Sequence, residues 1–391
     1  MHELVAMDLG GSAAFVDALV RTWEAGDAAM PIDQRLPASA RHRLAKEMRA
    51  GAVVDSSGSR TVLDGGLAVE GGDALVMVTS GTTGSPKGAV LTHEAVAASA
   101  TATSSRLGVD PSADRWLACL PLAHVGGLSV VTRALLTGTP VEVHPSFDPD
   151  VVGRAPHETG ATLVSLVPVA LERLRADAAA RFRRIVLGGQ APPGGLGANV
   201  SVTYGMTETG SGVVYDGVAL DGVEVAIKDG QILLRCPMLL RTYRDGTDPR
   251  VEGGYYPTGD AGRIGPDGRL EVFGRLDDAV VSGGEKVWPA GLEVVLGRHR
   301  HVASVAVGGR PDATWGERVV AYVVAEPGSV PTAPAQARTL LSELRDLVKS
   351  EYQAYAAPRG LVIVPELPLT AIGKVRRSAL GALSEWPEVI W

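Results

Sequence analysis

Cysteine is scarce in this chain of 391 residues, since only Cys119 and Cys236 are present. Two cysteines in a chain of this length make no disulfide framework, and no CxxC or cysteine–histidine cluster indicates a metal site. Long apolar runs are missing as well. The most apolar window, 117–136, contains His124, Arg133 and several glycines, so it falls short of the roughly 20 uninterrupted apolar residues of a membrane span. The sequence therefore predicts no membrane span.

Positive charge is not concentrated anywhere in the chain. The net charge is −7 and no run of lysine or arginine occurs, which argues against nucleic acid or an anionic membrane as the main partner. The first residues, Met1 to Leu4, lack the basic and apolar regions of a signal peptide, so we expect a cytoplasmic protein. Aromatic residues make up only 5% of the chain, whereas hydrophobic (45%) and charged (21%) contents are ordinary for globular proteins. The length allows two or more domains.

What the chain does have is a dense cluster of phosphate-binding residue types at 77–92, MVTSGTTGSPKGAVLT. Glycines let backbone N–H groups face anionic oxygens, and the hydroxyls and the lysine add donors and charge. A Walker A loop is disfavoured because Pro86 and Gly88 stand where that motif needs glycine and serine or threonine. The alternative is a turn without a ligand. The predicted phosphate-binding residues are Thr79, Ser80, Gly81, Thr82, Thr83, Gly84 and Lys87.

The periodicity of apolar residues changes twice along the chain. Short apolar runs alternate with helical stretches in the first half, which predicts a layered α/β domain with a largely parallel sheet. From about Val218, short strands separated by Gly/Asp/Pro turns indicate a β-rich, antiparallel section. After Gly274 the pattern indicates a small α+β domain. The predicted strands are 74–79, 116–120, 141–143, 162–166, 184–187, 301–308, 319–325 and 360–364, and the predicted helices are 94–106, 168–180 and 334–355.

Four further segments carry polar groups that packing alone does not explain. They are PLAHVGG around His124, GGQAP at 188–192, TYGMTET at 203–209 and YPTGD ending at Asp260. Each has a plain structural alternative, because His124 can be a satisfied structural histidine, Glu208 a capping carboxylate and Asp260 a turn residue. The segment 188–192 follows a predicted strand, where α/β sheets bind ligands. Together the segments supply what an ATP site needs: an aromatic ring for adenine, carboxylates for ribose and Mg²⁺, and phosphate donors.

The order of these motifs resembles the acyl-adenylate-forming superfamily of acyl-CoA synthetases, luciferases and the adenylation domains of nonribosomal synthetases. The resemblance runs from Ala74 to Leu380 and includes GRLDDAVVSGGEKVWP and, near the end, PLTAIGKV. It implies an α/β fold with a large N-terminal layered α/β domain (1–274), a hinge (275–278) and a small, mobile α+β C-terminal domain (279–391). The implied activity is that of an AMP-forming acid–CoA ligase using ATP, Mg²⁺ and coenzyme A.

The resemblance also implies roles for individual residues. Thr207 would meet the α-phosphate, Glu208 would bind Mg²⁺, and Asp260 with Arg275 would hold the ribose. Adenine would be framed by Gly188, Gly189, Gln190, Ala191, Pro192, Tyr204, Gly205 and Met206.

Residues near the end of the chain and at the hinge complete the implied mechanism. Lys374 would stabilise the transition state of adenylation, with a solvated surface lysine as the alternative reading. Asp277 occupies the hinge position, and Ser282, Gly283 and Gly284 would line the coenzyme A side of the site. His124 stands where the superfamily has a gating side chain over the acyl pocket.

Within the superfamily, the short N-terminal portion and the run 215–223 make the chain resemble the o-succinylbenzoate–CoA ligases of menaquinone biosynthesis. Such a substrate carries a second carboxylate, for which Arg133 and Ser211 are the candidate anchors, since a charge in an apolar stretch needs a partner. Arg133 on a helix surface is the alternative. Another aryl or acyl acid–CoA ligase, an adenylation enzyme loading a carrier protein, and a catalytically silent nucleotide-binding protein stay open. The oligomeric state is open too, with a homodimer as one candidate.

Overall fold

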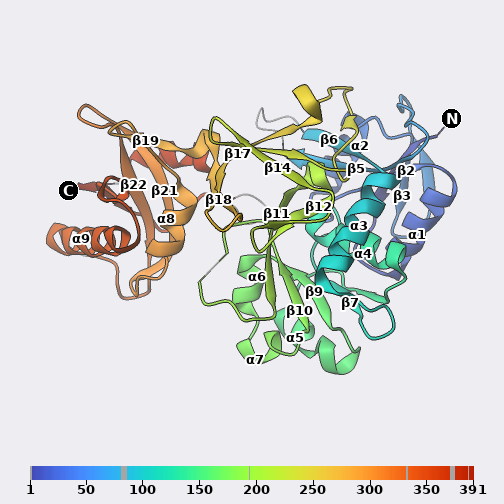
Figure 1. Cartoon of the computed structure of the whole chain (residues 1–391), viewed down its shortest axis with the longest axis horizontal. Helices are drawn as coiled ribbons and strands as arrows, with labels where there is room; N and C mark the ends of the chain where they lie inside the picture. The colour runs from blue at the N-terminus through green and yellow to red at the C-terminus, as the bar shows by residue number, and fades with distance from the viewer. Residues whose placement is uncertain (1, 81–85, 193, 332, 370–374, 386) are drawn as a thin grey trace. The chain divides into compact units, whose positions relative to one another are not determined.

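The computed structural model of the chain describes residues 2–80, 86–192, 194–331, 333–369, 375–385 and 387–391. The chain divides into two compact units (Figure 1). The first comprises Met1–Ala226, Leu233–Pro257 and Ile264–Leu270, and the second comprises Ile227–Ile232, Thr258–Arg263 and Glu271–Trp391. The predicted boundary at 275–278 stays a prediction, because this division assigns residues on both sides of it to the second unit.

The first sheet of unit 1 contains the strand that leads into the predicted phosphate loop. Its strand order is β16-β6-β5-β2-β1-β3-β4, with β1, β2, β3 and β5 parallel and β4, β6 and β16 antiparallel to their neighbours. The predicted strand 74–79 is confirmed within β5. The strands are β1 Leu4–Asp8, β2 Ala28–Pro31, β3 Ala52–Asp55, β4 Arg60–Val62, β5 Asp73–Ser80, β6 Pro86–Thr92 and β16 Thr242–Tyr243.

No strand is predicted from the sequence before residue 74. This was wrong, because β1, β2, β3 and β4 lie there. Strands β1 and β2 are short and alanine-containing, and nearly every residue in them is buried on both sides, so they show no apolar/polar alternation. Two helices, α1 Ala13–Glu24 and α2 Ala38–Glu47, accompany them.

The second sheet of unit 1 has the order β13-β12-β11-β10-β9-β7-β8 and is parallel from β8 to β11. This confirms the predicted layered, largely parallel domain. Figure 1 shows the short helices α5, α6 and α7 gathered around strands β9 and β10. The strands are β7 Trp116–Ala118, β8 Val141–Val143, β9 Leu163–Leu166, β10 Arg184–Leu187, β11 Val200–Met206, β12 Ser211–Tyr215 and β13 Val218–Ala219.

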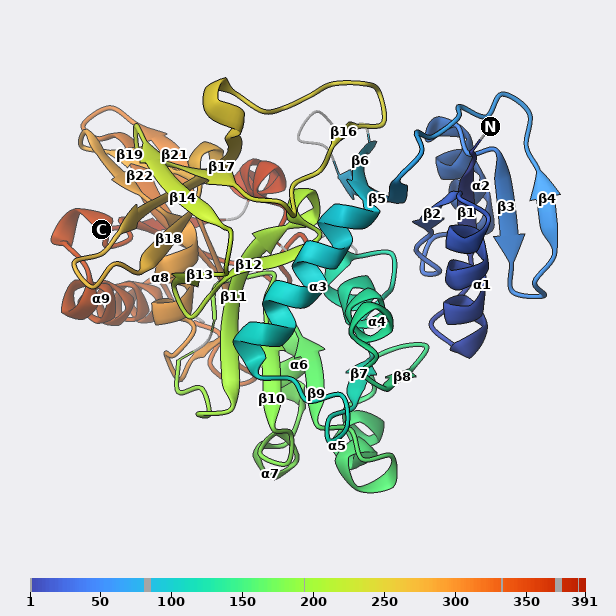
Figure 2. The same ribbon diagram turned by 45° about the vertical axis from the view of Figure 1, so that its right-hand side comes forward.

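Helices α3 (His93–Leu107) and α4 (Val125–Thr137) lie side by side in unit 1 (Figure 2). Helix α3 begins where the Thr92 hydroxyl accepts the Ala95 N–H and ends at Gly108, whose φ of 56° is in the left-handed region. It packs on β5 and β6 of one sheet and on β12 of the other. The remaining helices of unit 1 are α5 Pro149–Glu158, α6 Pro168–Arg173 and α7 Ala176–Ala179.

The predicted single helix 168–180 is interrupted. Leu174 has extended backbone angles (φ −85°, ψ 128°) and separates α6 from α7. The Leu174 side chain is buried with the apolar residues under β9 and β10, so tertiary packing overrides the local helix preference.

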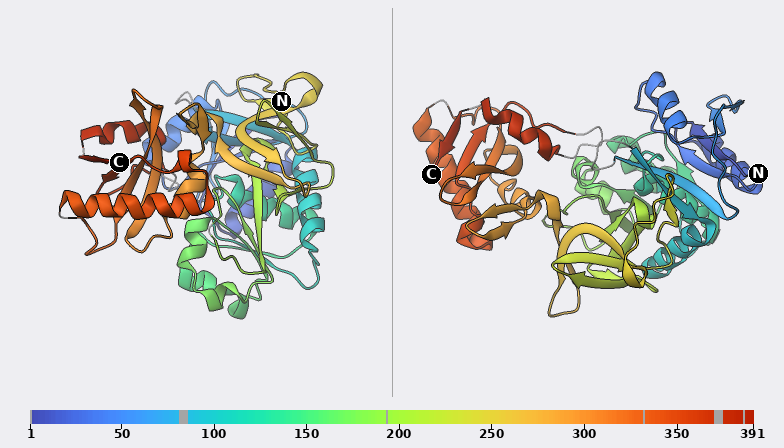
Figure 3. Two further views of the ribbon diagram at one scale, coloured as in Figure 1. Left: turned by 60° about the vertical axis from the view of Figure 1, so that its left-hand side comes forward. Right: turned by 90° about the horizontal axis from the view of Figure 1, so that it is seen from above.

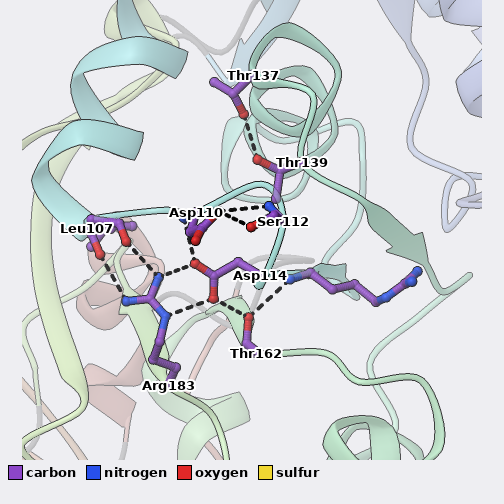
Figure 4. A network of polar contacts seen from close by, with 10 residues as sticks. Leu107, Asp110, Ser112, Asp114, Thr137, Thr139, Thr162 and Arg183 are labelled. Carbon is purple, nitrogen blue, oxygen red and sulfur yellow. Dashed lines mark hydrogen bonds and ion pairs between the residues drawn. The ribbon is translucent and has the colours of Figure 1, made fainter.

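A buried carboxylate connects three segments of unit 1 at the edge of the second sheet where β7, β9 and β10 begin (Figure 4). Asp114, just before β7, accepts hydrogen bonds from Arg183 Nε (2.8 Å) and Nη2 (2.6 Å) and from the Thr162 hydroxyl (2.7 Å). Arg183 Nη1 also donates to the carbonyl of Leu107 at the end of α3 (3.1 Å). The network therefore fixes the ends of α3, β7, β9 and β10 with respect to one another.

A third sheet, with the order β14-β15-β17-β18, forms the predicted β-rich section. Asp229 and Gly230 both have positive φ (52° and 79°) between β14 and β15, as expected of a tight hairpin turn. The strands are β14 Glu224–Lys228, β15 Gln231–Arg235, β17 Tyr256–Ile264 and β18 Leu270–Arg275. The division into two units runs through these strands.

The second unit contains a sheet of order β20-β19-β22-β23-β24, with β21 paired to β22. Helix α9, orange-red in the left view of Figure 3, runs along this sheet and buries Leu340, Leu341 and Leu344. It ends at Glu351, earlier than the predicted Tyr355, because Tyr352 is extended. The elements are β19 Val280–Ser282, β20 Glu285–Val287, α8 Pro289–Leu296, β21 Val302–Asp312, β22 Gly316–Ala325, α9 Pro334–Glu351, β23 Gly360–Ile363 and β24 Glu388–Ile390.

Short 3₁₀ helices complete the fold at Thr207–Thr209, Glu252–Gly254, Leu276–Asp278, Ala354–Ala356 and Arg377–Glu385. No helix in the described part of the chain is long and apolar enough to cross a bilayer.

Candidate active site

The predicted phosphate loop joins two paired strands. Thr79 faces Lys87, and Ser80 faces Pro86, in the antiparallel β5–β6 pair. The Thr79 hydroxyl donates to the Lys87 carbonyl (3.5 Å). Gly81, Thr82, Thr83 and Gly84 lie outside the described residues, so their predicted role stays a prediction.

The segments predicted to frame adenine come from neighbouring strands. Strands β10 and β11 are parallel, with Leu187 opposite Val202, so the turn 188–192 and the run 204–208 both lie toward the same edge of the sheet. Close packing explains why positions 188 and 205 are glycines. A Cβ on Gly188 would lie 2.8 Å from Thr203 Oγ1, and one on Gly205 would lie 2.2 Å from the Ser211 carbonyl oxygen. The structure therefore brings these two predicted segments together.

Glu208, the predicted Mg²⁺ ligand, lies in the 3₁₀ turn Thr207–Thr209 that follows β11. Its Oε1 accepts a hydrogen bond of 2.8 Å from the Tyr243 hydroxyl, which is 3.2 Å from the Tyr256 hydroxyl. Burial, then the hydrogen bond with Tyr256 and the charge of Glu208, raise the pKa of Tyr243, so its hydroxyl stays protonated. The Tyr243 ring centroid also lies 5.2 Å from Lys87 Nζ. Sequence reasoning missed Tyr243, whose only local signal is an aromatic residue before the turn Arg244-Asp245-Gly246.

A lone carboxylate is suited to Mg²⁺, which is commonly held by one or two carboxylates together with substrate phosphates and water. Among the residues that the structure describes, no group of three or more His, Cys, Asp or Glu side chains could hold a metal ion by itself. Glu208, which shares its neighbour Tyr243 with Lys87, therefore fits a magnesium–nucleotide complex better than a free-standing metal centre.

In the second unit, the predicted ribose residues are in contact. Arg275 Nη1 lies 3.3 Å from Asp260 Oδ1 and donates to the Thr258 carbonyl (2.8 Å). Gly259 has a φ of 73°, and a Cβ there would lie 2.7 Å from Arg275 Nη2. The glycine is thus required for the close approach of the arginine.

Ser282 is the last residue of β19, and Gly283 and Gly284 form the turn to β20. Both glycines have positive φ (63° and 85°), and the Gly283 N–H donates to the Trp315 carbonyl (2.8 Å). Asp277 lies in the 3₁₀ turn Leu276–Asp278. The hinge and coenzyme A roles of these residues stay predictions, and Lys374 lies outside the described residues.

His124 is the N-cap residue of α4 and half exposed. Its Nε2 lies 2.9 Å from Arg35 Nη2 and 3.5 Å from Asp33 Oδ2. Burial raises the pKa of Asp33, but hydrogen bonds and charge from Arg35 outweigh it, so the net pKa is lowered and Asp33 stays ionised. Gly127, at the start of α4, has to be a glycine, because a Cβ there would lie 2.5 Å from two carbonyl oxygens. Sequence reasoning missed Asp33 and Arg35, which lie far from His124 in the chain.

Arg133 and Ser211, the predicted acyl anchors, are also in contact. Arg133 is 1% exposed, its Nη2 donates to the Ser211 hydroxyl (3.1 Å), and its guanidinium carbon lies 4.8 Å from the Trp116 ring centroid. Its Nε and Nη1 find no hydrogen-bond partner in the described part of the molecule. Arg133 is therefore buried, which rules out the helix-surface alternative.

The comparisons with known proteins show the family of the chain. A family model described as AMP-binding enzyme matches residues 68–238, and one described as AMP-binding enzyme C-terminal domain matches 291–374. The chain is 39% identical over 331 residues to the probable 2-succinylbenzoate–CoA ligase of Mycobacterium tuberculosis (strain ATCC 25618 / H37Rv), a match covering 78% of this chain and 83% of the relative. It is 34% identical over 334 residues to the 2-succinylbenzoate–CoA ligase of Listeria monocytogenes serotype 4b (strain F2365), covering 78% and 69%.

A solved structure shows the same fold. The o-succinylbenzoate CoA synthetase (MenE) of Bacillus subtilis in complex with the acyl-adenylate intermediate OSB-AMP has a TM-score of 0.81 and 27% identity, covering 97% of this chain and 88% of that chain. The same synthetase in complex with ATP and a magnesium ion has a TM-score of 0.80 and 26% identity, covering 97% and 89%. These matches show that the chain belongs to the AMP-binding enzyme family, in the acyl-adenylate-forming superfamily, and is an AMP-forming acid–CoA ligase.

Proposed function

We propose that the chain is a 2-succinylbenzoate–CoA ligase of menaquinone biosynthesis. In the first step a carboxylate oxygen of the acid attacks the α-phosphorus of ATP, the bond to the β-phosphate oxygen breaks, and pyrophosphate leaves. In the second step the sulfur of coenzyme A attacks the acyl carbon of the adenylate, AMP leaves, and the thiol proton is lost to solvent. The similarity to named 2-succinylbenzoate–CoA ligases is the observation that carries the proposal. An enzyme consuming ATP and coenzyme A would act in the cytoplasm.

Different residues of this chain would bind different parts of ATP in the first step. Lys87 and the loop before it would hold the β- and γ-phosphates, and Glu208 would hold a magnesium ion that neutralises phosphate charge. Thr207 would meet the α-phosphate, while Tyr204 and the turn 188–192 would frame adenine. Asp260 and Arg275 would hold the ribose hydroxyls. Lys374 would bridge the attacking carboxylate and the α-phosphate, offsetting their repulsion.

Arg133 supports a substrate with two carboxylates. A cation buried to this degree is costly unless an anion or several hydrogen bonds compensate it, and Ser211 supplies only one hydroxyl. The second carboxylate of 2-succinylbenzoate would compensate the charge of Arg133 and accept a hydrogen bond from Nε or Nη1, the two nitrogen atoms that lack a protein partner in the described residues. A monocarboxylic acid would leave that charge uncompensated.

The test is pyrophosphate exchange with a panel of acids, followed by mass spectrometry of the coenzyme A thioester. Exchange restricted to 2-succinylbenzoate is expected, and exchange with a different aryl or acyl acid would redirect the assignment. No exchange with any acid would favour a silent nucleotide-binding protein. Lys374→Ala is expected to abolish adenylate formation and to spare thioester formation from a supplied adenylate. Equal loss in both half-reactions would contradict the role of Lys374.

A further inference from the structure

Tyr243 contacts both Glu208, the proposed magnesium ligand, and Lys87, the proposed phosphate-binding lysine. It lies in the two-residue strand β16, which pairs with β6 so that Tyr243 faces Ala89. The side chain is 7% exposed. Its hydroxyl reaches Glu208, and its ring lies beside Lys87. The two ends of one buried side chain therefore touch the predicted metal ligand and the predicted phosphate lysine.

The direction of the hydrogen bonds follows from the donor inventory. A carboxylate only accepts, so the single hydroxyl proton of Tyr243 points to Glu208 Oε1. In the hydrogen bond between the two tyrosine hydroxyls, Tyr256 must then be the donor and Tyr243 the acceptor. The result is a chain from Tyr256 through Tyr243 to Glu208, in which the carboxylate receives a charge-assisted hydrogen bond in a mostly buried setting.

The ring of Tyr243 acts on the other residue. Lys87 Nζ at 5.2 Å from the ring centroid is within the range of a cation–π contact. Lysine is a flexible side chain with four rotatable bonds, so a fixed ring beside its ammonium group limits where the charge can lie. The Tyr243 backbone itself is fixed by its pairing with β6, the strand that carries Lys87.

We infer that Tyr243 is a positioning residue for the magnesium–ATP complex. The hydroxyl fixes Oε1 of Glu208 and so leaves Oε2 for the metal ion, while the ring fixes the ammonium group of Lys87 for the phosphates. The inference rests on the proposed roles of Glu208 and Lys87. It adds that the two functions of Tyr243 are separable, because the hydroxyl serves the metal and the ring serves the phosphates.

The experiment measures ATP binding without turnover, by isothermal titration in the absence of any acid, across a series of MgCl₂ concentrations. Tyr243→Phe keeps the ring and removes the hydroxyl. The magnesium concentration for half-maximal enhancement of ATP binding is expected to rise about tenfold, with ATP binding in EDTA unchanged. Tyr243→Leu removes both groups and is expected, in addition, to weaken ATP binding in EDTA by about three- to tenfold. The electron paramagnetic resonance spectrum of Mn²⁺ with ATP should change in both variants.

Tyr255→Phe is the matched control. Tyr255 is the neighbour of Tyr256 in the chain, and its hydroxyl donates to Glu224 (3.1 Å) instead of to the site. It should leave both ATP binding and its magnesium dependence unchanged. In a Glu208→Gln background, Tyr243→Phe should have no further effect on the magnesium dependence, since the partner of the hydroxyl is altered.

Two outcomes would overturn the inference. One is a wild-type magnesium dependence in Tyr243→Phe, and the other is an equal loss of ATP binding with and without magnesium in that variant. Should Tyr243→Leu fail to fold, as judged by its thermal unfolding, Tyr256→Phe takes its place and is expected to shift the magnesium dependence in the same direction by a smaller factor. Because no acid is present, a wrong substrate assignment would leave these results unaffected.

Discussion

The Nη2 atom of Arg35 lies 2.9 Å from Nε2 of His124. A guanidinium group only donates hydrogen bonds, so the imidazole nitrogen accepts here and the ring proton lies on Nδ1. Arg35 is itself held by Asp33, whose carboxylate accepts from its Nε (2.9 Å) and Nη2 (2.6 Å). A side chain predicted to gate the acyl pocket is thus oriented by two residues from the loop after β2.

Arg35→Ala should therefore impair the use of the acid more than the use of ATP. Without the guanidinium, the ring of His124 loses a charge-assisted hydrogen bond and gains rotational freedom, so we expect the KM for the acid to rise about three- to tenfold. The KM for ATP should stay within twofold. Steady-state kinetics with each substrate varied in turn measures both. Arg43→Ala, on the exposed face of α2, is the control and should change neither, whereas an equal rise in both KM values would contradict the role of Arg35.

Asp114→Asn should destabilise unit 1. The Asp114 side chain is 4% exposed and accepts charge-assisted hydrogen bonds from Arg183, which is 39% exposed and so partly screened. Losing these bonds should lower the free energy of unfolding by about 2 kcal/mol, measured by urea denaturation at pH 7. Asp177→Asn removes a carboxylate of an exposed pair with Arg175 and should change little. A variant as stable as the wild type would show that the network in Figure 4 contributes nothing.

The contribution of Asp114 to the free energy of unfolding should also depend on pH, and it should fall on acidification. Burial raises the pKa of its carboxyl, but hydrogen bonds from Arg183 and Thr162 outweigh burial and lower the net pKa. A carboxyl whose pKa is lower in the folded state stabilises the fold fully above its unfolded pKa, roughly 3.9. That stability is lost as the pH falls through the folded pKa. The difference between wild type and Asp114→Asn should therefore shrink below about pH 4, and a difference that grows on acidification would contradict the assignment.

The sequence predicted best where the determinants are local. Helix α3 was predicted within one residue at each end, and the residues that limit it are local, since Thr92 caps its start and Gly108 its end. Gly188 and Gly205 were assigned to the site by the resemblance of their motifs to the superfamily, and both sit where a Cβ would collide with neighbouring atoms. These signals lie within a few residues of the feature that they specify.

The residues that were missed act over long separations in the chain. Arg35 and His124 are 89 positions apart, and Tyr243 and Glu208 are 35 apart, so no spacing rule connects either pair. Both contacts arise only once the sheets have formed, because β2 carries the loop of Arg35 and the β16–β6 pair carries Tyr243. Arg133 was singled out only from the cost of an unpaired charge, and its contact with Ser211 and its depth of burial required the structure.

Glu388→Gln should loosen the last strand of unit 2. The Glu388 carboxylate accepts from Arg318 Nε (2.9 Å) and Nη2 (2.8 Å) and from Arg310 Nη1 (2.6 Å). These bonds hold β24 against β23, where Val389 faces Leu361. Neutralising the carboxylate weakens all three, so amide hydrogen exchange at Leu361 should speed up by about ten- to a hundredfold. Glu366→Gln, at an exposed position, is the control, and unchanged exchange in Glu388→Gln would show that backbone pairing alone retains β24.

Gly283→Ala should separate the two half-reactions. Gly283 has a φ of 63°, and a Cβ there would lie 2.9 Å from Cε3 of Trp315, so the substitution strains the backbone and displaces the ring. If this turn lines the coenzyme A side of the site, transfer from a supplied acyl-adenylate to coenzyme A should slow about tenfold, while pyrophosphate exchange stays unchanged. Gly328→Ala shares the positive φ (81°) but has open space around the new Cβ, so it reports backbone strain alone. If pyrophosphate exchange slowed as much as transfer, Gly283 would matter only for the folding of unit 2. An unchanged transfer rate would show that this turn does not contact coenzyme A.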